Sequence, residues 1–543
     1  MHIQYEPLSG HNPFLDRYIE EDPALMTFYD YSYQVTDLQE RAKELKARNF
    51  QRAKLKSVLK TYNESLTSNQ ATFEQIDKLG DDRSLMIVGG QQAGLFTGPM
   101  YTINKVISIL AHAKETEENL GVPVVPLFWI AGEDHDIDEI NHAFIHYKGE
   151  LKRVAMRERN DLKIPASKRS LDQSQVMKQL KESLLYLRET VHTKDLYEEW
   201  EQLIFSSTTY VEFFAKLIHR LFEGTGLVLM DAADEQIRKL ERPFFKDLIE
   251  ENESVRDAFT EQAKAFQEAG NGSPVQVDMN LSHLFIHDND ERILLYFDEE
   301  REAFVDKEGH RSWTKNELLK VAEEEPERLS NNVISRPLMQ EWLLPVLGFI
   351  SGPGEIRYWG TLKKLFHFFN FQIPPLLPRM QFSIVERGAE KYLKALDLNL
   401  WQVASAGVEE SREEWYEKNK PIDYDPIFET AEAEMRKVME KVAEGLNSTD
   451  ATKMDYERFT ERSLQGLEQY KRTVGKQVDH LLRPTLNHFD HVRTVLHPNG
   501  GLQERTVNVL PFLNEYGSDL IQRLSVEIIN RGSKHHYHTF VFL

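Results

Sequence analysis

Two short apolar runs, each followed at once by a polar loop, constrain the fold of this chain more than any other feature. The first run, residues 85–88, leads into the glycine-rich loop GGQQAGLFTGP at 89–99 and then into an amphipathic segment at 101–114. The second run, residues 124–130, is followed by Glu133, Asp134, His135 and Asp136. A repeated strand, tight turn and helix predict an α/β sheet whose parallel strands carry polar groups at their carboxyl ends, where such sheets bind ligands.

Further short apolar runs extend this pattern. They lie at residues 226–231, 343–350 and 376–385, so that five predicted strands alternate with helical segments. This alternation favours a parallel, doubly wound sheet. Between residues 275 and 304 the apolar period changes to two β-rich runs around Asp288, Asn289 and Asp290, which predicts an antiparallel hairpin inserted into the core. Residues 36–65 and most of 151–223 are predicted to be helical.

The composition changes near Glu386, and a helical stripe of apolar residues follows. The stripe comprises Phe428, Ala431, Met435, Val438, Val442 and Leu446, and it resumes at Tyr456, Phe459, Leu467, Tyr470, Val474, Val478 and Leu481. Two long helices joined by a polar turn at 445–450 predict an antiparallel coiled-coil hairpin. An ordinary pair of core helices is the alternative, but the many charges outside the stripe favour a protruding arm. We therefore divide the chain into a catalytic core with helical and β-hairpin insertions, residues 1–385, and a C-terminal coiled-coil domain, residues 386–543.

The composition excludes several classes of function. The formal net charge is −22, so no excess of Lys and Arg is available to neutralise the phosphates of nucleic acid or an anionic membrane. The chain contains no cysteine, which excludes disulfides, thiolate nucleophiles and zinc–thiolate centres. The first residues lack the basic start and apolar stretch of a signal peptide, and no apolar run is long enough to span a bilayer. We expect a cytoplasmic protein that binds neither nucleic acid nor membrane.

The glycine-rich loop is the first candidate for binding a substrate or a nucleotide. Glycines let backbone N–H groups approach a phosphate, and the start of the following helix adds a positive partial charge. The loop matches neither GxGxxG nor GxxxxGK[ST], so no standard nucleotide motif applies. A tight turn whose glycines serve only packing is the alternative. The candidate binding residues are Gln91, Gln92, Gly94, Thr97 and Gly98.

The acidic cluster after the second run is the candidate catalytic centre. A carboxylate beside an imidazole can act as a general base with its orienting partner. Helix capping by Asp134 or Asp136 is one alternative, and a divalent metal site is another. The spacing is not HExxH, and we assign no metal to it. We predict that Glu133, Asp134, His135 and Asp136 are catalytic, and that Asn141 and His142 contribute to binding. A helix through this segment would place His135 and His142 on one face.

A third strand end carries further candidates. The turn SGPGEIRYW at 351–359 follows an apolar run, and its glycines would let a ligand approach. Carboxylate and aromatic side chains in it can bind an amine or stack on a ring. The predicted binding residues here are Gly352, Gly354, Glu355, Tyr358 and Trp359, with Arg379 as a candidate for an anion. For Arg379 a structural salt bridge is the alternative. The polar residues at 503–508 either bind a ligand or fix the arm to the core.

Four motifs together resemble one family. The runs GGQQAGLFTGPMYTINK, FWIAGEDHDIDEINH, SGPGEIRYW and QERTVNVLPFLNEYG occur in this order over essentially the whole chain. In these motifs the chain resembles the BshC family, the cysteine ligases of bacillithiol biosynthesis. The resemblance implies a Rossmann-like core related to class I synthetases and nucleotidyltransferases, with a C-terminal coiled coil through which two copies form a homodimer.

The resemblance also implies a reaction. This is the addition of L-cysteine, through its carboxyl group, to the glucosamine nitrogen of glucosaminyl malate in the last step of bacillithiol biosynthesis. An amide made from a free carboxylate needs activation, so a nucleotide, ATP or ADP, is the chemical expectation, and the HIGH and KMSKS signatures of class I synthetases are absent. Two alternatives stay open: another nucleotidyltransferase or adenylate-forming enzyme, and a non-catalytic coiled-coil scaffold.

Overall fold

The chain forms two compact units in a computed structural model. The structure describes residues 1–543 apart from 9, 11, 148–149, 158–162, 290 and 446–449, and apart from the side chains of 450–455. One unit comprises Met1–Val385 with Leu502–Leu543, and the other is Glu386–Gly501. The predicted second domain ran from 386 to 543, whereas its last segment, Leu502–Leu543, groups with the first unit in the structure.

A five-stranded parallel sheet forms the centre of the first unit. Its strands, in spatial order, are β13 (Leu376–Pro378), β12 (Val346–Ser351), β2 (Leu85–Gln91), β3 (Val124–Ile130) and β6 (Val228–Asp231). Neighbouring strands all pair in parallel, with Gln91 opposite Ile130 and Ile130 opposite Asp231. The predicted parallel, Rossmann-like sheet is therefore confirmed, and the carboxyl ends of its strands meet at one edge.

Helices cover the sheet, which explains why its strands read as continuous apolar runs. Every residue of β3 is buried. The surrounding helices include α3 (Val35–Lys46), α4 (Arg52–Glu64), α5 (Gln70–Asp77) and α6 (Tyr101–Leu120), of which α6 packs against both β2 and β3. A Cβ atom added at Gly89 of β2 would lie 3.0 Å from Ile109 Cδ1 of α6, so this glycine lets α6 pack closely on the sheet. The predicted helix at 36–65 is two helices, α3 and α4.

Two insertions interrupt the sheet along the chain. The first, between β3 and β6, contains α7 (Ile137–Ile140), β4 (His142–Tyr147), β5 (Glu150–Ala155), α8 (Gln173–Tyr186), α9 (Thr193–Phe205) and α10 (Tyr210–Leu221). The second, between β6 and β12, contains α11 (Glu235–Glu250), α12 (Asn252–Phe266), β7 (Leu281–Asp288), β8 (Glu291–Asp298), β9 (Ala303–Val305), β10 (Ser312–Thr314), α13 (Lys315–Glu324), β11 (Leu329–Asn331) and α14 (Ser335–Leu343). Asp288 pairs with Glu291, so the predicted hairpin is confirmed as β7–β8. Asp290 in its turn lies outside the described residues.

A three-stranded sheet explains why the C-terminal segment belongs to the first unit. The last strand, β15 (Tyr537–Phe542), lies between β1 (His2–Pro7) and β14 (Gln381–Val385). The single edge strand predicted at 376–385 is thus two strands in different sheets. The chain turns between them because Met380 N donates to Ser108 Oγ at 3.0 Å instead of continuing the ladder of β13. The remaining helices of this unit are α1 (Pro13–Ile19), α2 (Pro23–Met26), α15 (Pro353–Trp359), α16 (Lys363–Phe368), α22 (Leu510–Tyr516) and α23 (Leu520–Arg531).

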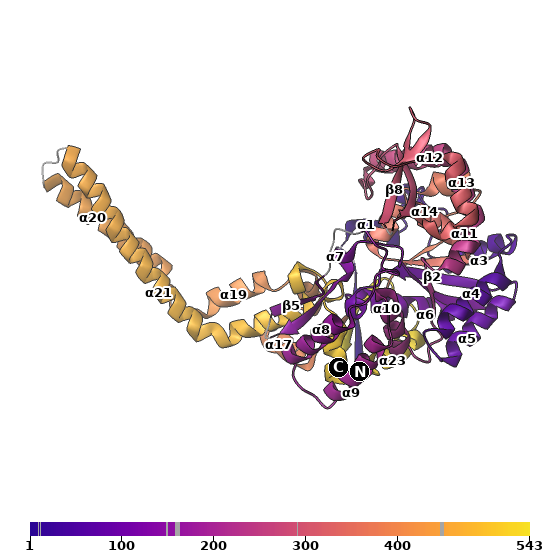
Figure 1. Cartoon of the computed structure of the whole chain (residues 1–543). Helices are drawn as coiled ribbons and strands as arrows, with labels where there is room; N and C mark the ends of the chain where they lie inside the picture. Colours follow the sequence, from indigo (N-terminus) through magenta and orange to yellow (C-terminus); the bar gives the residue numbers. More distant parts are fainter. Residues whose placement is uncertain (9, 11, 148–149, 158–162, 290, 446–449) are drawn as a thin grey trace. The chain divides into compact units, whose positions relative to one another are not determined.

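Helices joined by short connections make up the second unit, and its described residues contain no strand. It contains α17 (Arg387–Leu396), α18 (Leu400–Ala406), α19 (Glu409–Asn419), α20 (Asp425–Gly445) and α21 (Asp450–Leu496). In Figure 1, α20 and the first part of α21 lie side by side, which confirms the predicted coiled-coil hairpin. Leu446 and the turn at 446–449 lie outside the described residues. Searched over the part of the chain that the structure describes, no helix has both the length and the apolar character needed to cross a membrane.

Candidate active site

A cavity of about 630 Å³ opens at the carboxyl ends of β2, β3 and β12. Along the chain β2 is followed by β3 on one side, while β12 lies on its other side, so the cavity sits at the point where the strand order reverses. This is where doubly wound sheets bind their ligands. The second insertion contributes most of the remaining walls, and Glu139 of α7 in the first insertion adds to them. The lining residues are Gly90, Gln91, Gln92, Ala131, Glu133, Asp134, His135, Glu139, Phe285, Arg292, Leu294, Asn331, Asn332, Val333, Arg336, Glu355 and Tyr358.

Asp134 presents an ionised carboxylate to this cavity. Gln92 Nε2 donates to its Oδ2 at 2.6 Å, and the backbone N–H of His135 donates to its Oδ1 at 2.7 Å. Burial by itself would raise the pKa of Asp134, but the charge of Arg292 and the hydrogen bond from Gln92 lower it below its usual value. Asp134 is therefore negatively charged at neutral pH and suited to hold a cation or a hydrogen-bond donor.

His135 lies against Arg292, a residue of β8. Arg292 Nη1 is 3.2 Å from His135 Nδ1, and a guanidinium can only donate, so Nδ1 is the acceptor. The neutral ring then carries its proton on Nε2. Burial lowers the pKa of His135, and the positive charge of Arg292 lowers it further. The arrangement makes His135 a neutral Nε2–H donor at neutral pH.

Glu133 has a supporting position. Its carboxylate is buried and pairs with Arg238 of α11, which also pairs with Glu241 at 2.6 Å. Burial raises the pKa of Glu241 to about 7, although Arg238 opposes this shift. The backbone N–H of Asn331 points to Glu133 Oε2 at 3.4 Å. Glu133 therefore ties the end of β3 to the second insertion.

The other predicted residues of the acidic cluster do not line the cavity. Asp136 is exposed, and α7 contains only the four residues Ile137–Ile140. His142 begins β4, where it pairs with Ala155, and its Nδ1 contacts Asn141 Oδ1 at 3.2 Å. The predicted helical face shared by His135 and His142 is therefore wrong, because the chain leaves the helix after one turn and enters a strand.

The glycine-rich loop divides into two parts. Gln91 and Gln92 line the cavity, whereas Gly94, Thr97 and Gly98 do not. A Cβ atom at Gly94 would lie 2.8 Å from Gly98 Cα, so these glycines are required for packing within the turn. Thr97 has a positive φ of 79°, a conformation that L residues rarely adopt. Asn508 holds the turn by donating to Phe96 O at 2.8 Å and to Gly98 O at 2.7 Å.

The end of β12 contributes Glu355 and Tyr358 of α15. Glu355 Oε2 accepts from Lys105 Nζ at 2.6 Å and from Gly352 N at 2.8 Å. Burial lowers the pKa of Lys105, and the charge of Glu355 opposes this effect. Gly352, Gly354 and Trp359 lie outside the cavity lining, and Trp359 packs in the core against Phe349 with ring centroids 4.9 Å apart.

Arg379 and the segment at 503–508 have structural contacts. Both Nη atoms of Arg379 donate to the carboxylate of Glu504, at 2.9 and 2.6 Å, and both residues are buried. Asn104 donates to the same carboxylate at 2.5 Å. Gln503 forms two hydrogen bonds with the backbone of Ile384 in β14. The structure therefore places Arg379 in a buried salt bridge outside the cavity, and the 503–508 segment fastens β14 and the glycine-rich turn.

Sequence reasoning missed the residues that the second insertion brings to the site. Arg292, Asn331, Asn332 and Arg336 all line the cavity. Arg292 stacks on Phe285, with its guanidinium carbon 3.7 Å from the ring centroid. The sequence offered one signal for Arg292, which is a charged residue on the buried side of the otherwise apolar strand ERILLYFD. No signal marked Asn331 or Arg336, because their place at the site depends on how the insertion docks.

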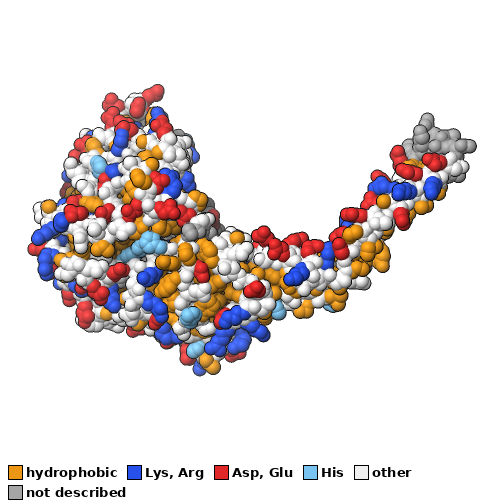
Figure 2. All heavy atoms as spheres, turned by 180° about the vertical axis from the view of Figure 1, so that it is seen from behind, with side chains coloured by type: hydrophobic (Ala, Val, Ile, Leu, Met, Phe, Trp, Pro, Cys, Tyr) orange, Lys and Arg blue, Asp and Glu red, His pale blue; other side chains and the backbone are white. Residues whose placement is uncertain are grey.

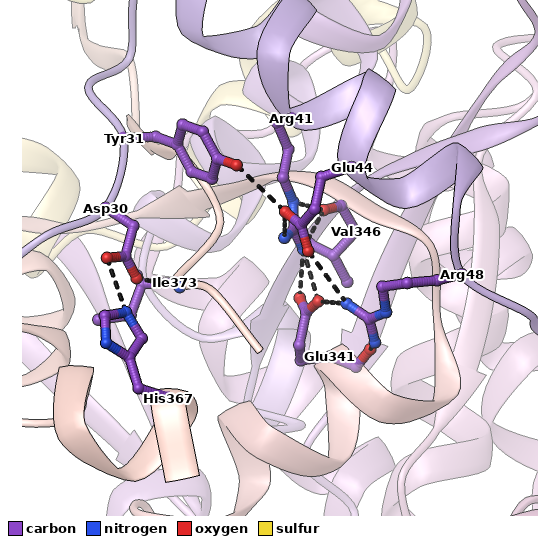
Figure 3. A network of polar contacts seen from close by, with 9 residues as sticks. All are labelled: Asp30, Tyr31, Arg41, Glu44, Arg48, Glu341, Val346, His367 and Ile373. Carbon is purple, nitrogen blue, oxygen red and sulfur yellow. Dashed lines mark hydrogen bonds and ion pairs between the residues drawn. The ribbon is translucent and has the colours of Figure 1, made fainter. Parts of the chain in front are cut away.

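A buried ion network positions α14, the helix that carries Arg336 (Figure 3). Arg41 Nη2 donates to both carboxylate oxygens of Glu341 at 2.6 Å, and Arg41 Nε donates to Val346 O of β12 at 3.1 Å. Arg48 pairs with the same carboxylate. Burial raises the pKa of Glu341, and both arginines oppose that rise. The network therefore fixes α14 to α3 and to the start of β12. Among the described residues, no group of three or more His, Asp or Glu side chains could hold a metal ion.

Comparisons with known proteins agree on one family. Residues 1–380 match the model of the N-terminal Rossmann-like domain of bacillithiol biosynthesis BshC, and residues 382–540 match that of its C-terminal coiled-coil domain. A relative from Bacillus cytotoxicus, named "Putative cysteine ligase BshC", is 37% identical over 98% of this chain and 98% of its own length. Proteins of the same name from Bacillus cereus and Bacillus anthracis are each 35% identical over 96% of both chains. The chain therefore belongs to the bacillithiol biosynthesis BshC family.

Proposed function

We propose that this chain is a carbon–nitrogen ligase that adds L-cysteine to glucosaminyl malate in bacillithiol biosynthesis. The observation that carries the proposal is the match, over nearly the full length of both chains, to relatives named as cysteine ligases. The cavity supports it, because carboxylates and guanidinium groups stand together at the strand ends. Both proposed substrates carry an amine and at least one carboxylate, and such a lining can hold both kinds of group.

The reaction requires an acceptor for one oxygen atom. A C–N bond forms between the acyl carbon of cysteine and the amine nitrogen, while one C–O bond of the carboxylate breaks and two protons leave the ammonium group. We propose that the oxygen leaves on a phosphate of a nucleoside triphosphate, whose phosphoanhydride bond breaks. The described cavity is a poor fit for a triphosphate, since four carboxylates line it beside two guanidinium groups. We therefore assign the cavity to glucosaminyl malate, whose amine attacks, and to the acyl carbon of cysteine, and we assign no residue of it to the nucleotide.

The residues of the cavity suggest a division of roles. Asp134 is held ionised and can bind the substrate ammonium group. His135 has no described hydrogen-bond partner at Nε2, so its N–H can donate to the oxygen on which negative charge develops when the amine attacks the acyl carbon. Arg292 fixes the ring for this role and adds its own positive charge.

Mass spectrometry of reaction mixtures tests the function. Purified protein is incubated with glucosaminyl malate, L-cysteine and either ATP, ADP or no nucleotide, and bacillithiol is measured as its thiol-labelled derivative. Product that depends on protein and on nucleotide supports the proposal. An adduct with another amino acid instead of cysteine would point to an adenylate-forming enzyme of different specificity. Absence of any adduct, with a folded protein, would favour the scaffold.

A further inference from the structure

We propose that Arg336, Tyr358 and Asn331 form a carboxylate-binding subsite in this cavity, and that it takes a carboxylate of the malyl group. The inference rests on the proposed function. All three residues line the cavity, where Arg336 comes from α14, Tyr358 from α15 and Asn331 from the end of β11. None of them was needed for the chemistry at the acyl carbon.

Arg336 is a partly buried cation that forms no ion pair with a carboxylate of the described residues. Its Nη2 donates to Tyr358 Oη, its Nε is buried with no hydrogen-bond partner, and it forms no ion pair with any described residue. The buried arginines Arg41, Arg238 and Arg379 differ, because each pairs with a glutamate. Glu133 and Glu355 act on Arg336 through their charge but form no hydrogen bond with it. A guanidinium that is partly out of water without a hydrogen-bonded counter-charge is costly unless the site has a use for it. Here that use is an anion.

Tyr358 supplies a second donor beside Arg336. Its hydroxyl oxygen accepts from Arg336 Nη2 and from Trp359 Nε1, the latter at 3.1 Å. Both lone pairs are thereby used, so the hydroxyl proton is left to donate, and no acceptor for it is present among the described residues. Burial raises the pKa of Tyr358, which keeps this proton in place at neutral pH.

Asn331 adds an amide whose polar atoms are unpaired. The residue is 1% exposed, and neither its Oδ1 nor its Nδ2 has a hydrogen-bond partner in the described structure. Its backbone is fixed on both sides, because Asn331 O accepts from Arg292 Nη2 at 2.6 Å and Asn331 N points to Glu133. This rigid, unsatisfied amide lines the same cavity as the Arg336 guanidinium, and its Nδ2 offers a further donor for a carboxylate.

The charges of the cavity select the carboxylate of a particular substrate. A single carboxylate balances Arg336, whereas a polyphosphate would meet the nearby charges of Glu133 and Glu355. The carboxylate of cysteine is the group that must react and lose an oxygen, so a subsite that engages a carboxylate with fixed donors is unsuited to it. The malyl carboxylates of the acceptor do not react, and holding one of them would orient the amine.

Isothermal titration calorimetry with the full chain tests the assignment. The probes are glucosaminyl malate, methyl glucosaminide, which lacks the malyl group, and L-cysteine. We expect R336Q to bind glucosaminyl malate about 10- to 100-fold more weakly, as for the loss of a charged hydrogen-bond partner, and to bind methyl glucosaminide and cysteine as the wild type does. Y358F should lose roughly tenfold for the same ligand. R242Q, at a partly exposed arginine of α11 that pairs with Glu323 and does not line the cavity, is the matched control and should leave the affinities for all three probes unchanged.

The outcomes separate the two proposals. Thermal unfolding of each variant first establishes that it is folded, and R336K replaces R336Q if the latter is not. If the wild type does not bind glucosaminyl malate, the proposed function fails and the subsite assignment fails with it. If the wild type binds and both R336Q and Y358F bind equally well, only the subsite assignment fails. A loss confined to cysteine would also overturn the assignment, because it would move the cysteine carboxylate to Arg336.

Discussion

Arg292 and His135 form a hydrogen bond of 3.2 Å between Nη1 and Nδ1, and this contact sets both the tautomer and the proton affinity of the ring. In the neutral ring Nδ1 is the nitrogen with the free lone pair, so His135 would need it to act as a general base, and Arg292 already occupies it. It also disfavours the imidazolium, since a second positive charge beside Arg292 would be repelled. His135 is therefore placed to donate from Nε2 rather than to remove a proton.

We expect that R292Q raises the pKa of His135 toward its usual value. In the wild type the pKa is lowered, so the ring stays neutral as pH falls below about 6.5, the ordinary value for histidine. Loss of the positive charge favours the protonated ring, which shifts its titration to higher pH. Nitrogen-15 NMR of labelled histidine, with H135A to assign the resonance, measures both the tautomer and the pKa. An unchanged titration in R292Q would contradict the role of this contact.

D134N and H135A should each reduce product formation by about 100-fold or more, because they remove charge and hydrogen-bond donation where the reacting groups meet. Both side chains line the cavity rather than the core, so circular dichroism and thermal unfolding should stay near those of the wild type. D136N is the matched control, since Asp136 is exposed and outside the cavity. Near-normal turnover in both D134N and H135A would move the active site elsewhere.

Substitution in the glycine-rich turn should lower the stability of the protein rather than its affinity for ligands. In G94A the new Cβ atom would lie 2.8 Å from Gly98 Cα, where only backbone can move, so we expect a loss of about 1–3 kcal/mol in the free energy of unfolding. G354A is the matched control, because no atom lies within 4 Å of the added Cβ. Alanine there should be neutral or stabilising by up to ~1 kcal/mol. Urea unfolding measures both. A stable G94A that binds substrate weakly would instead support a ligand-binding role for the glycine.

Glu341 should be essential for stability because it balances two arginines in the network of Figure 3. E341Q would leave buried Arg41 with only the partly exposed Glu44 as its counter-charge, and we expect a loss of about 3 kcal/mol in urea unfolding, the lower end for a broken buried ion pair. E40Q is the control, since Glu40 and Lys43 form an exposed pair with side chains 63% and 72% exposed. Its expected effect is below ~1 kcal/mol. An E341Q protein as stable as the wild type would show that the network does not anchor α14.

The site residues at the strand ends could be predicted from sequence. Parallel strands bring their carboxyl ends to one edge of the sheet, however long the segments between the strands are. Gln92, Asp134, His135 and Glu355 meet for that reason. The role of Arg379 could not be decided from sequence, since its partner Glu504 is 125 residues away and is brought to it by the pairing of Gln503 with β14. The role of Gly94 and Gly98 could not be decided either. A glycine that lets a ligand approach the backbone and a glycine that packs against another glycine look alike in sequence.

Arg292, Asn331 and Arg336 illustrate a second limit. They lie in the insertion between β6 and β12, and only its docking over the strand ends brings them to the cavity. Local periodicity predicts the hairpin that carries Arg292, but it contains no information about which surface the hairpin covers. The two guanidinium groups that line the cavity, those of Arg292 and Arg336, were for this reason absent from the sequence-based prediction, while its carboxylates Asp134 and Glu355 were present.

The apolar stripe of the coiled-coil arm is only partly covered within one chain. Along α20 and α21, Figure 2 shows hydrophobic side chains at the surface. In these helices Val438 is 55% exposed, Val442 51% and Tyr470 62%. A row of exposed apolar residues at helical spacing is typical of an interface. Two-fold dimers are the commonest oligomers, and an antiparallel arm presents a self-complementary surface to a second copy.

We therefore predict a homodimer through α20 and α21, and V438D/V442D should dissociate it. The two valines are four residues apart and share one face of α20, so the two aspartates would place charge in the seam at a cost of several kcal/mol. K437D/K441D is the matched control, because it adds negative charge at the same spacing on exposed, charged positions of the same helix. Sedimentation velocity at micromolar concentration measures the state of each protein. A wild type that sediments as a monomer refutes the dimer at once. A dimeric wild type whose V438D/V442D variant stays dimeric and folded would place the interface on the first unit, since charge buried in the arm would then have no effect on association.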